Sequence, residues 1–118
     1  MRAAIRRLHT PDAPSLHEYR PEDESDFALL VQVIVGPHGG EGEESVDVEV
    51  VTPACISRRL SDSGPMSGRH LLLVELFDAN AIQRWIERAV AGCIGSTWRE
   101  VAEKLSRIGH WEFEDYVE

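Results

Sequence analysis

The hydrophobic positions in the first half of the chain follow the patterns typical of β-strands. Residues 27–35 are almost all apolar and rich in branched side chains, which predicts a strand at the centre of a sheet. After the glycine-rich segment 36–42, Val46, Val48 and Val50 alternate with mostly polar neighbours. This alternation predicts a strand with one core face and one exposed acidic face, joined to the first strand as a β-hairpin with a long loop.

Three other segments have the pattern of extended chain. Residues 3–8 predict a first strand that contains Ile5 and Leu8. Residues 70–77 are apolar at nearly every position, which predicts another central strand. Residues 111–116 alternate aromatic and acidic side chains and predict a final strand.

The segment 10–26 contains three prolines and several turn-forming residues, which predict a long loop. Leu16 and Tyr19 are its large apolar or aromatic side chains, so we expect them to anchor the loop against the domain. Further along, Thr52 and Pro53 have the order of a helix cap and a first helical residue, which predicts a short helix that ends near residue 60.

The periodicity changes in the C-terminal third of the chain. Apolar residues recur at spacings of three and four from Ile82 to Cys93, which predicts an amphipathic helix that begins at Asp78 or Asn80. A second helix is predicted after residues 97–100, which have the spacing of a capping box. Its apolar side chains continue to residue 108, and the glycine at position 109 is expected to end it.

The order of these elements predicts the fold class. Strands come first and the two amphipathic helices come last, which is typical of an α+β domain. We therefore expect a mainly antiparallel sheet of about four or five strands, with two C-terminal helices packed on one face. A length of 118 residues suits one domain, which we assign to residues 1–118.

Charge narrows the classes of partner. Asp and Glu number 21 against 12 Lys and Arg, which gives a net charge of −9. This balance argues against nucleic-acid binding and against docking on an anionic membrane, and it favours a basic protein partner.

The basic N-terminus lacks the apolar run of a signal peptide, and the longest apolar runs are too short to span a membrane. We expect a cytoplasmic protein in which Cys55 and Cys93 are reduced and partly buried.

The sequence offers little chemistry for an enzyme. Its five histidines have no metal-site spacing, and the glycine-rich segment lacks the Gly-Lys-Ser/Thr ending of a phosphate-binding loop. We therefore expect no catalytic residues, no metal and no cofactor. A small hydrolase that uses a carboxylate pair or Cys55 is the alternative from this class.

The acidic residues are grouped along the chain. A first group lies around the predicted hairpin and contains Glu41, Glu43, Glu44, Asp47 and Glu49. A second group is interleaved with aromatic residues near the C-terminus and contains Trp111, Glu112, Glu114 and Tyr116. We predict that these nine residues form the binding surface for a basic partner, with Trp111 or Tyr116 as an aromatic anchor. A purely solvated acidic face is the alternative.

Several segments in order resemble the immunity protein 8 family of bacterial polymorphic toxin systems. They are Leu8-His9-Thr10-Pro11-Asp12, Tyr19-Arg20-Pro21-Glu22-Asp23, Gly36-Pro37 with Glu41-Gly42-Glu43-Glu44-Ser45, Thr52-Pro53, Gly68-Arg69-His70, residues 97–109 and residues 111–116. Together they span nearly the whole chain.

This resemblance implies a non-enzymatic immunity protein that binds and neutralises a cognate toxin domain in the cytoplasm of the producing cell. Many toxin domains of such systems are nucleases with basic substrate channels, so the resemblance also implies that a nuclease is a suitable target. It supplies no catalytic residues and no set of toxin contacts. A general interaction module with a basic partner other than a toxin is the alternative, and the pattern leaves a homo-oligomer open.

Overall fold

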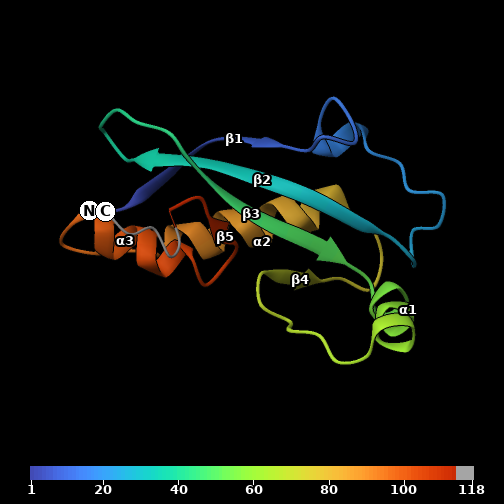
Figure 1. Cartoon of the computed structure of the whole chain (residues 1–118). Helices are drawn as coiled ribbons and strands as arrows, with labels where there is room; N and C mark the ends of the chain where they lie inside the picture. Colours follow the sequence, from blue (N-terminus) through green and yellow to red (C-terminus); the bar gives the residue numbers. More distant parts are fainter. Residues whose placement is uncertain (114–118) are drawn as a thin grey trace.

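A computed structural model describes residues 1–113 of the chain as an α+β fold (Figure 1). Its five strands are β1 (Ala3–His9), β2 (Ala28–Pro37), β3 (Glu44–Val51), β4 (Leu71–Leu73) and β5 (His110–Trp111). Its helices are the 3-10 helix η1 (Leu16–Glu18) and the α-helices α1 (Pro53–Ser63), α2 (Ala79–Ala91) and α3 (Trp98–Leu105). The prediction of a mainly antiparallel sheet with helices is therefore confirmed, with a third α-helix between β3 and β4.

The sheet is built on an antiparallel meander of β1, β2 and β3. The two remaining strands share the other edge of β3. β5 pairs antiparallel with Val46 and Asp47, whereas β4 pairs parallel with residues 49–51. β2 is therefore central, as its continuous apolar pattern predicted.

One face of this sheet carries the core. Val46, Val48 and Val50 of β3 are at most 1% exposed, and the intervening Asp47 and Glu49 lie on the opposite face. The buried side chains of α2 and α3 belong to the same hydrophobic cluster as these valines. The alternation predicted for this strand is confirmed, and Figure 1 shows α2 and α3 beside the sheet.

The predicted central strand over residues 70–77 is wrong in its length and its place. β4 has three residues and lies at the sheet edge, where Leu73 is 62% exposed. Leu76, which lies beyond the end of the strand, is 54% exposed. The chain leaves the sheet because Phe77 packs edge-on against Tyr19 and Phe27 at ring-centroid distances of 5.3 and 5.5 Å. Its backbone N–H donates to Glu24 O at 2.9 Å, which ties this segment to the N-terminal loop.

The same aromatic cluster explains how the loop 10–26 is held. Leu16 is buried in the core and Tyr19 packs against the two phenylalanines, so both predicted anchors are confirmed. Burial raises the pKa of Tyr19 above its usual value.

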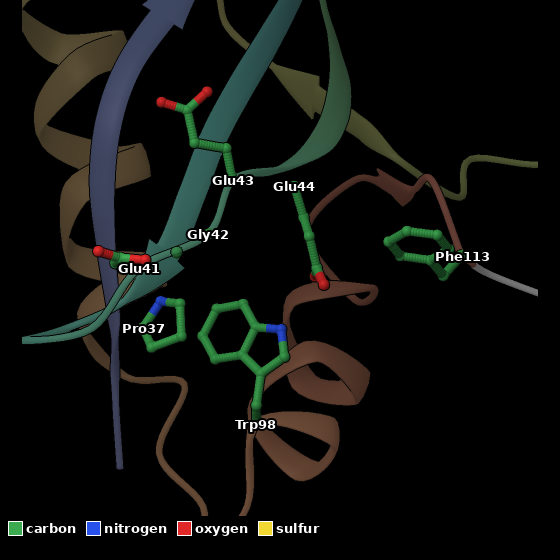
Figure 2. Close-up of a pocket in the computed structure, with 8 residues that line it drawn as sticks. Pro37, Glu41, Gly42, Glu43, Glu44, Trp98 and Phe113 are labelled. Carbon is green, nitrogen blue, oxygen red and sulfur yellow. The ribbon is translucent and has the colours of Figure 1, made fainter.

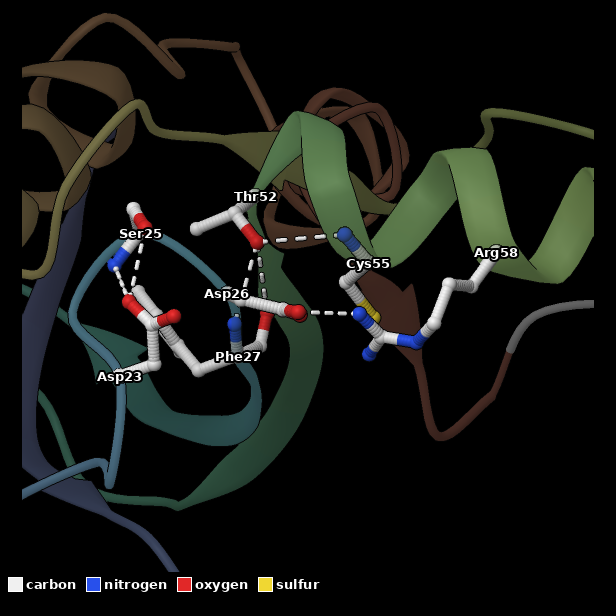
Figure 3. A network of polar contacts seen from close by, with 7 residues as sticks. All are labelled: Asp23, Ser25, Asp26, Phe27, Thr52, Cys55 and Arg58. Carbon is white, nitrogen blue, oxygen red and sulfur yellow. Dashed lines mark hydrogen bonds and ion pairs between the residues drawn. The ribbon is translucent and has the colours of Figure 1, made fainter.

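Helix α1 begins as predicted and runs three residues beyond the expected end. The Thr52 hydroxyl accepts from Cys55 N at 3.4 Å and from Phe27 N at 3.1 Å, which fastens the helix start to the loop before β2 (Figure 3). Arg58 forms an ion pair with Asp26 at the same place. Cys55 and Cys93 are both buried and free, and burial raises the pKa of the Cys93 thiol.

The C-terminal elements differ from the prediction in two details. α2 begins after the Asp78 cap, and Trp85, which falls within the apolar repeat predicted from Ile82 to Cys93, is 40% exposed. α3 begins after the Thr97 cap and ends at Leu105, before the predicted stop at Gly109. A Cβ atom on Gly109 would lie 2.5 Å from Asp47 O, so this glycine serves the close crossing of β3 instead.

The predicted final strand over residues 111–116 is also too long within the described chain. β5 ends at Trp111, and Glu112 and Phe113 form a turn. Trp111 packs against the core, whereas Phe113, an aromatic residue of the predicted strand, is 39% exposed. None of the helices in the described part of the chain is long and apolar enough to cross a membrane.

Candidate functional site

The first acidic group predicted from the sequence is divided between the two faces of the sheet. Glu44 is paired with the buried Val35, so it lies on the helix-covered side at the beginning of β3. Asp47 and Glu49 lie on the open side, opposite the core valines. These acids therefore do not form one continuous surface.

The two open-face carboxylates differ in their surroundings: Glu49 is paired within the chain, whereas Asp47 is partly buried. Both oxygens of Glu49 accept from the Arg59 guanidinium of α1 at 2.7 Å, which lowers the pKa of Glu49 and raises that of Arg59. Asp47 lies beside His110 of β5, and its Oδ1 atom is buried without a hydrogen-bond partner. The open face therefore offers less free negative charge than its sequence suggests.

The remaining acids of this group surround a pocket of about 220 Å³ at the loop end of the β2–β3 hairpin (Figure 2). Its lining residues come from the hairpin, from the start of α3 and from the turn after β5. They are Gly36, Pro37, Glu41, Gly42, Glu43, Glu44, Trp98 and Phe113. We call this hollow the hairpin pocket.

The hairpin pocket combines an apolar wall with a carboxylate rim. Figure 2 shows the Trp98 indole beside Pro37, with the Glu44 side chain pointing toward the indole and the Glu43 side chain pointing away. Trp98 is the first residue of α3 and is partly buried against the core, so its ring is held in place by packing. Such a wall can contact the apolar part of a ligand while the rim contacts a cationic group.

Arg6 and Arg7 of β1 both contact the loop that forms the pocket. The strand has an irregularity between Ile5 and Arg7, which leaves Arg6 as an extra residue in the ladder. The Arg6 guanidinium donates to Pro37 O at 3.0 Å and to Gly40 O at 2.7 Å. The loop conformation is therefore fixed by a side chain from the neighbouring strand.

The three rim carboxylates differ in how far they are neutralised. Arg7 donates to both oxygens of Glu43 at 2.9 and 3.1 Å, and this pairing lowers the pKa of Glu43. Glu44 accepts from the uncharged Trp111 Nε1 at 2.9 Å, so its negative charge is not cancelled by that contact. Within the described residues, no hydrogen bond or ion pair engages the exposed Glu41 side chain. Glu41 and Glu44 therefore carry the unpaired charge of the pocket.

The second predicted group lies partly beside this pocket. Glu112 accepts from Ser45 N at 2.8 Å and thereby fastens the end of β5 to β3. Trp111 connects the two groups, because its indole donates to Glu44 and its ring packs edge-on against Phe113 at 5.6 Å. The predicted site residues Glu114 and Tyr116 lie outside the described residues.

A second hollow, of about 550 Å³, lies beside the start of α2. It is lined by groups of both signs, including His17, Arg20, Glu24 and Asp78, so it has no consistent electrostatic preference. Across residues 1–113, no group of three or more His, Cys, Asp or Glu side chains has the arrangement of a metal site. Within that same part of the chain, Cys55 forms no hydrogen bond with a histidine.

Sequence reasoning did not assign Pro37, Trp98 or Phe113 to a site. Trp98 is among the apolar residues of the helix predicted after the capping box, and its partial burial is consistent with that pattern. Its position in the wall of the hairpin pocket depends on the hairpin loop. This loop is more than fifty residues away in the chain and reaches α3 only in the folded structure. No local signal marks such a contact.

Comparison with known proteins is consistent with the resemblance inferred from the ordered segments. A family model described as Immunity protein 8 matches residues 3–116, which is nearly the whole chain. Neither the search of curated proteins nor the search of solved structures returned a match. Because the family match extends over both the sheet and all the helices, the chain belongs to the immunity protein 8 family.

Proposed function

We propose that this protein neutralises a cognate toxin domain by binding it, without catalysis, at the hairpin-pocket end of the sheet. The observation that carries the proposal is the unpaired charge of Glu41 and Glu44 beside the exposed apolar wall of the hairpin pocket. Membership of an immunity protein family supports a toxin as the partner. An interface needs such a combination, because charge accelerates encounter and apolar contacts supply affinity.

A nuclease is the toxin class that best complements this surface. A nuclease channel must be basic to hold a phosphate backbone, and a net charge of −9 on the inhibitor favours its encounter with that channel. In this proposal the protein acts in the cytoplasm of the producing cell, where it blocks the toxin before export.

Co-expression tests the function directly. The C-terminal domain encoded by the adjacent toxin gene is expressed under tight control in a naive host, with and without this protein. We expect growth arrest by the toxin domain alone and growth in the presence of this chain. A toxic domain that arrests growth equally in both strains contradicts the pairing and favours an interaction module with another partner.

Charge reversal distinguishes the two faces of the sheet. Glu44→Lys changes the pocket side and Asp47→Lys changes the open side of the same strand. We expect Glu44→Lys to slow association with the toxin domain by about tenfold at low salt and to flatten the salt dependence. Stopped-flow association measures both variants, and a larger effect of Asp47→Lys would place the binding surface on the open face.

A further inference from the structure

We propose that the hairpin pocket receives one arginine side chain of the toxin, which serves as the anchor of the complex. This inference rests on the proposed function and adds to it the chemical group that fills the pocket. Three properties of the pocket support it, namely its size, its apolar wall and its charge.

The size of the pocket suits a single long side chain. Its volume of about 220 Å³ is that of roughly seven waters. This space is adequate for the methylenes and guanidinium of arginine, and it is too small for a helix or a strand of the partner. A side chain inserted here is surrounded by three separate parts of the chain, namely the hairpin, α3 and the turn after β5.

The wall of the pocket favours a flat cation over a compact one. The Trp98 indole is partly buried, and its ring borders the pocket next to Pro37 (Figure 2). Tryptophan is the best aromatic partner for a cation, and a guanidinium stacks on it while remaining free to donate hydrogen bonds at its edge. An ammonium group is more strongly hydrated and loses more on leaving water.

The carboxylates at the rim of the pocket supply hydrogen-bond acceptors for the edge of the guanidinium. Glu44 already accepts one hydrogen bond from Trp111 Nε1, and a carboxylate has further lone pairs for a second donor. Glu41 lies on the opposite part of the lining and has no partner in the described chain. The third carboxylate, Glu43, is already held by Arg7, which donates to both of its oxygens, so Glu41 and Glu44 are the acceptors left for a ligand.

The decisive variant removes the charge of each carboxylate and keeps one acceptor oxygen at each position. In Glu41→Gln/Glu44→Gln the amide oxygen at position 44 can still accept from Trp111 Nε1, so the local fold is retained. A matched control, Glu18→Gln/Glu87→Gln, changes the net charge equally at exposed positions outside the pocket. Affinity for the adjacent-gene toxin domain is measured by calorimetry, and folding of each variant is checked by thermal unfolding.

We expect the pocket variant to bind about tenfold or more weakly, and the control to bind within about twofold of the wild type. A second step replaces each exposed arginine of the toxin domain by alanine, in turn, against both versions of this protein. We expect one arginine whose loss weakens binding to the wild type and has little further effect on the pocket variant.

Failures of the two proposals give different results. If the wild type neither binds nor protects, the proposed function is wrong and the anchor with it. If the wild type binds and the pocket variant binds equally well, only the pocket assignment is wrong. If the pocket variant and the control lose the same affinity, or if no single arginine couples to the pocket, attraction is diffuse and the anchor is overturned.

Discussion

At the scale of single residues, the acidic positions on β3 have different structural roles despite their similar sequence context. Glu49 is held by two hydrogen bonds from Arg59, whereas the neighbouring outward residue Asp47 has a buried oxygen without a partner. A count of carboxylates in the sequence treats them as equal contributors to one surface. Their different environments lead to opposite predictions for stability.

Glu49→Gln is expected to destabilise the protein at neutral pH. Arg59 lowers the pKa of folded Glu49, so the folded state binds this proton less readily than the unfolded state does. The pair therefore stabilises the fold above the ordinary carboxyl pKa, and this stabilisation is lost as pH falls through the lower, folded pKa. We expect a loss of about 1 kcal/mol at pH 7, because the pair is about a third exposed, with the difference fading below about pH 4.

Urea unfolding of the wild type and Glu49→Gln at several pH values measures this effect. Glu87→Gln is the control, because Glu87 is exposed on α2 and takes no part in the Glu49–Arg59 ion pair. A constant difference between wild type and Glu49→Gln at all pH values would show that packing, and not ionisation, accounts for the loss.

Asp47→Thr is expected to stabilise the protein. The substitution removes a buried carboxylate oxygen that lacks a hydrogen bond and introduces a side chain that favours strands. We expect an increase of about 1 kcal/mol in the free energy of unfolding, measured by urea titration at pH 7. A decrease would mean that the Asp47 carboxylate makes a stabilising contact in solution.

At the scale of elements, the close crossing of β3 by the chain entering β5 depends on one glycine. Gly109→Ala would place a methyl group 2.5 Å from Asp47 O and 2.9 Å from Val46 Cγ1. We expect a loss of about 2 kcal/mol in stability and a drop in melting temperature, because the backbone of a central strand cannot move away. Gly68→Ala is the control, since a Cβ there meets nothing within 4 Å, and an equal loss in both variants would contradict this explanation.

The elements also differ in how well sequence predicted them. β2 and β3 were predicted correctly because their burial alternates along the strand. This alternation constrains the hydrophobicity of each residue and therefore leaves a signal in the sequence. Residues 74–77 share the apolar composition of a strand, yet Phe77 is drawn into an aromatic cluster with residues fifty and more positions earlier. A contact between distant segments leaves no periodic signal, and the hairpin pocket was missed for the same reason.

At the scale of the whole molecule, charge and fold act on different steps of binding. In the proposed complex, a net charge of −9 would attract a basic toxin over a distance comparable with the Debye length, whereas the pocket would act only after contact. We expect the association rate to fall by about tenfold or more between about 0.05 and about 0.5 M NaCl, with a much smaller change in the dissociation rate. Stopped-flow and surface-based dissociation measurements separate the two, and a dissociation rate that carries the salt dependence would contradict this division.

The attachment of the hairpin loop to β1 has a consequence for how the proposed binding surface can vary. Arg6 donates hydrogen bonds to the carbonyl oxygens of Pro37 and Gly40, which are main-chain atoms that every amino acid possesses. Residues such as His38 and Glu41 can therefore be exchanged while these two hydrogen bonds are kept. If the hairpin is the toxin-binding surface proposed above, the residues that contact the toxin can change at these positions while the loop keeps its conformation.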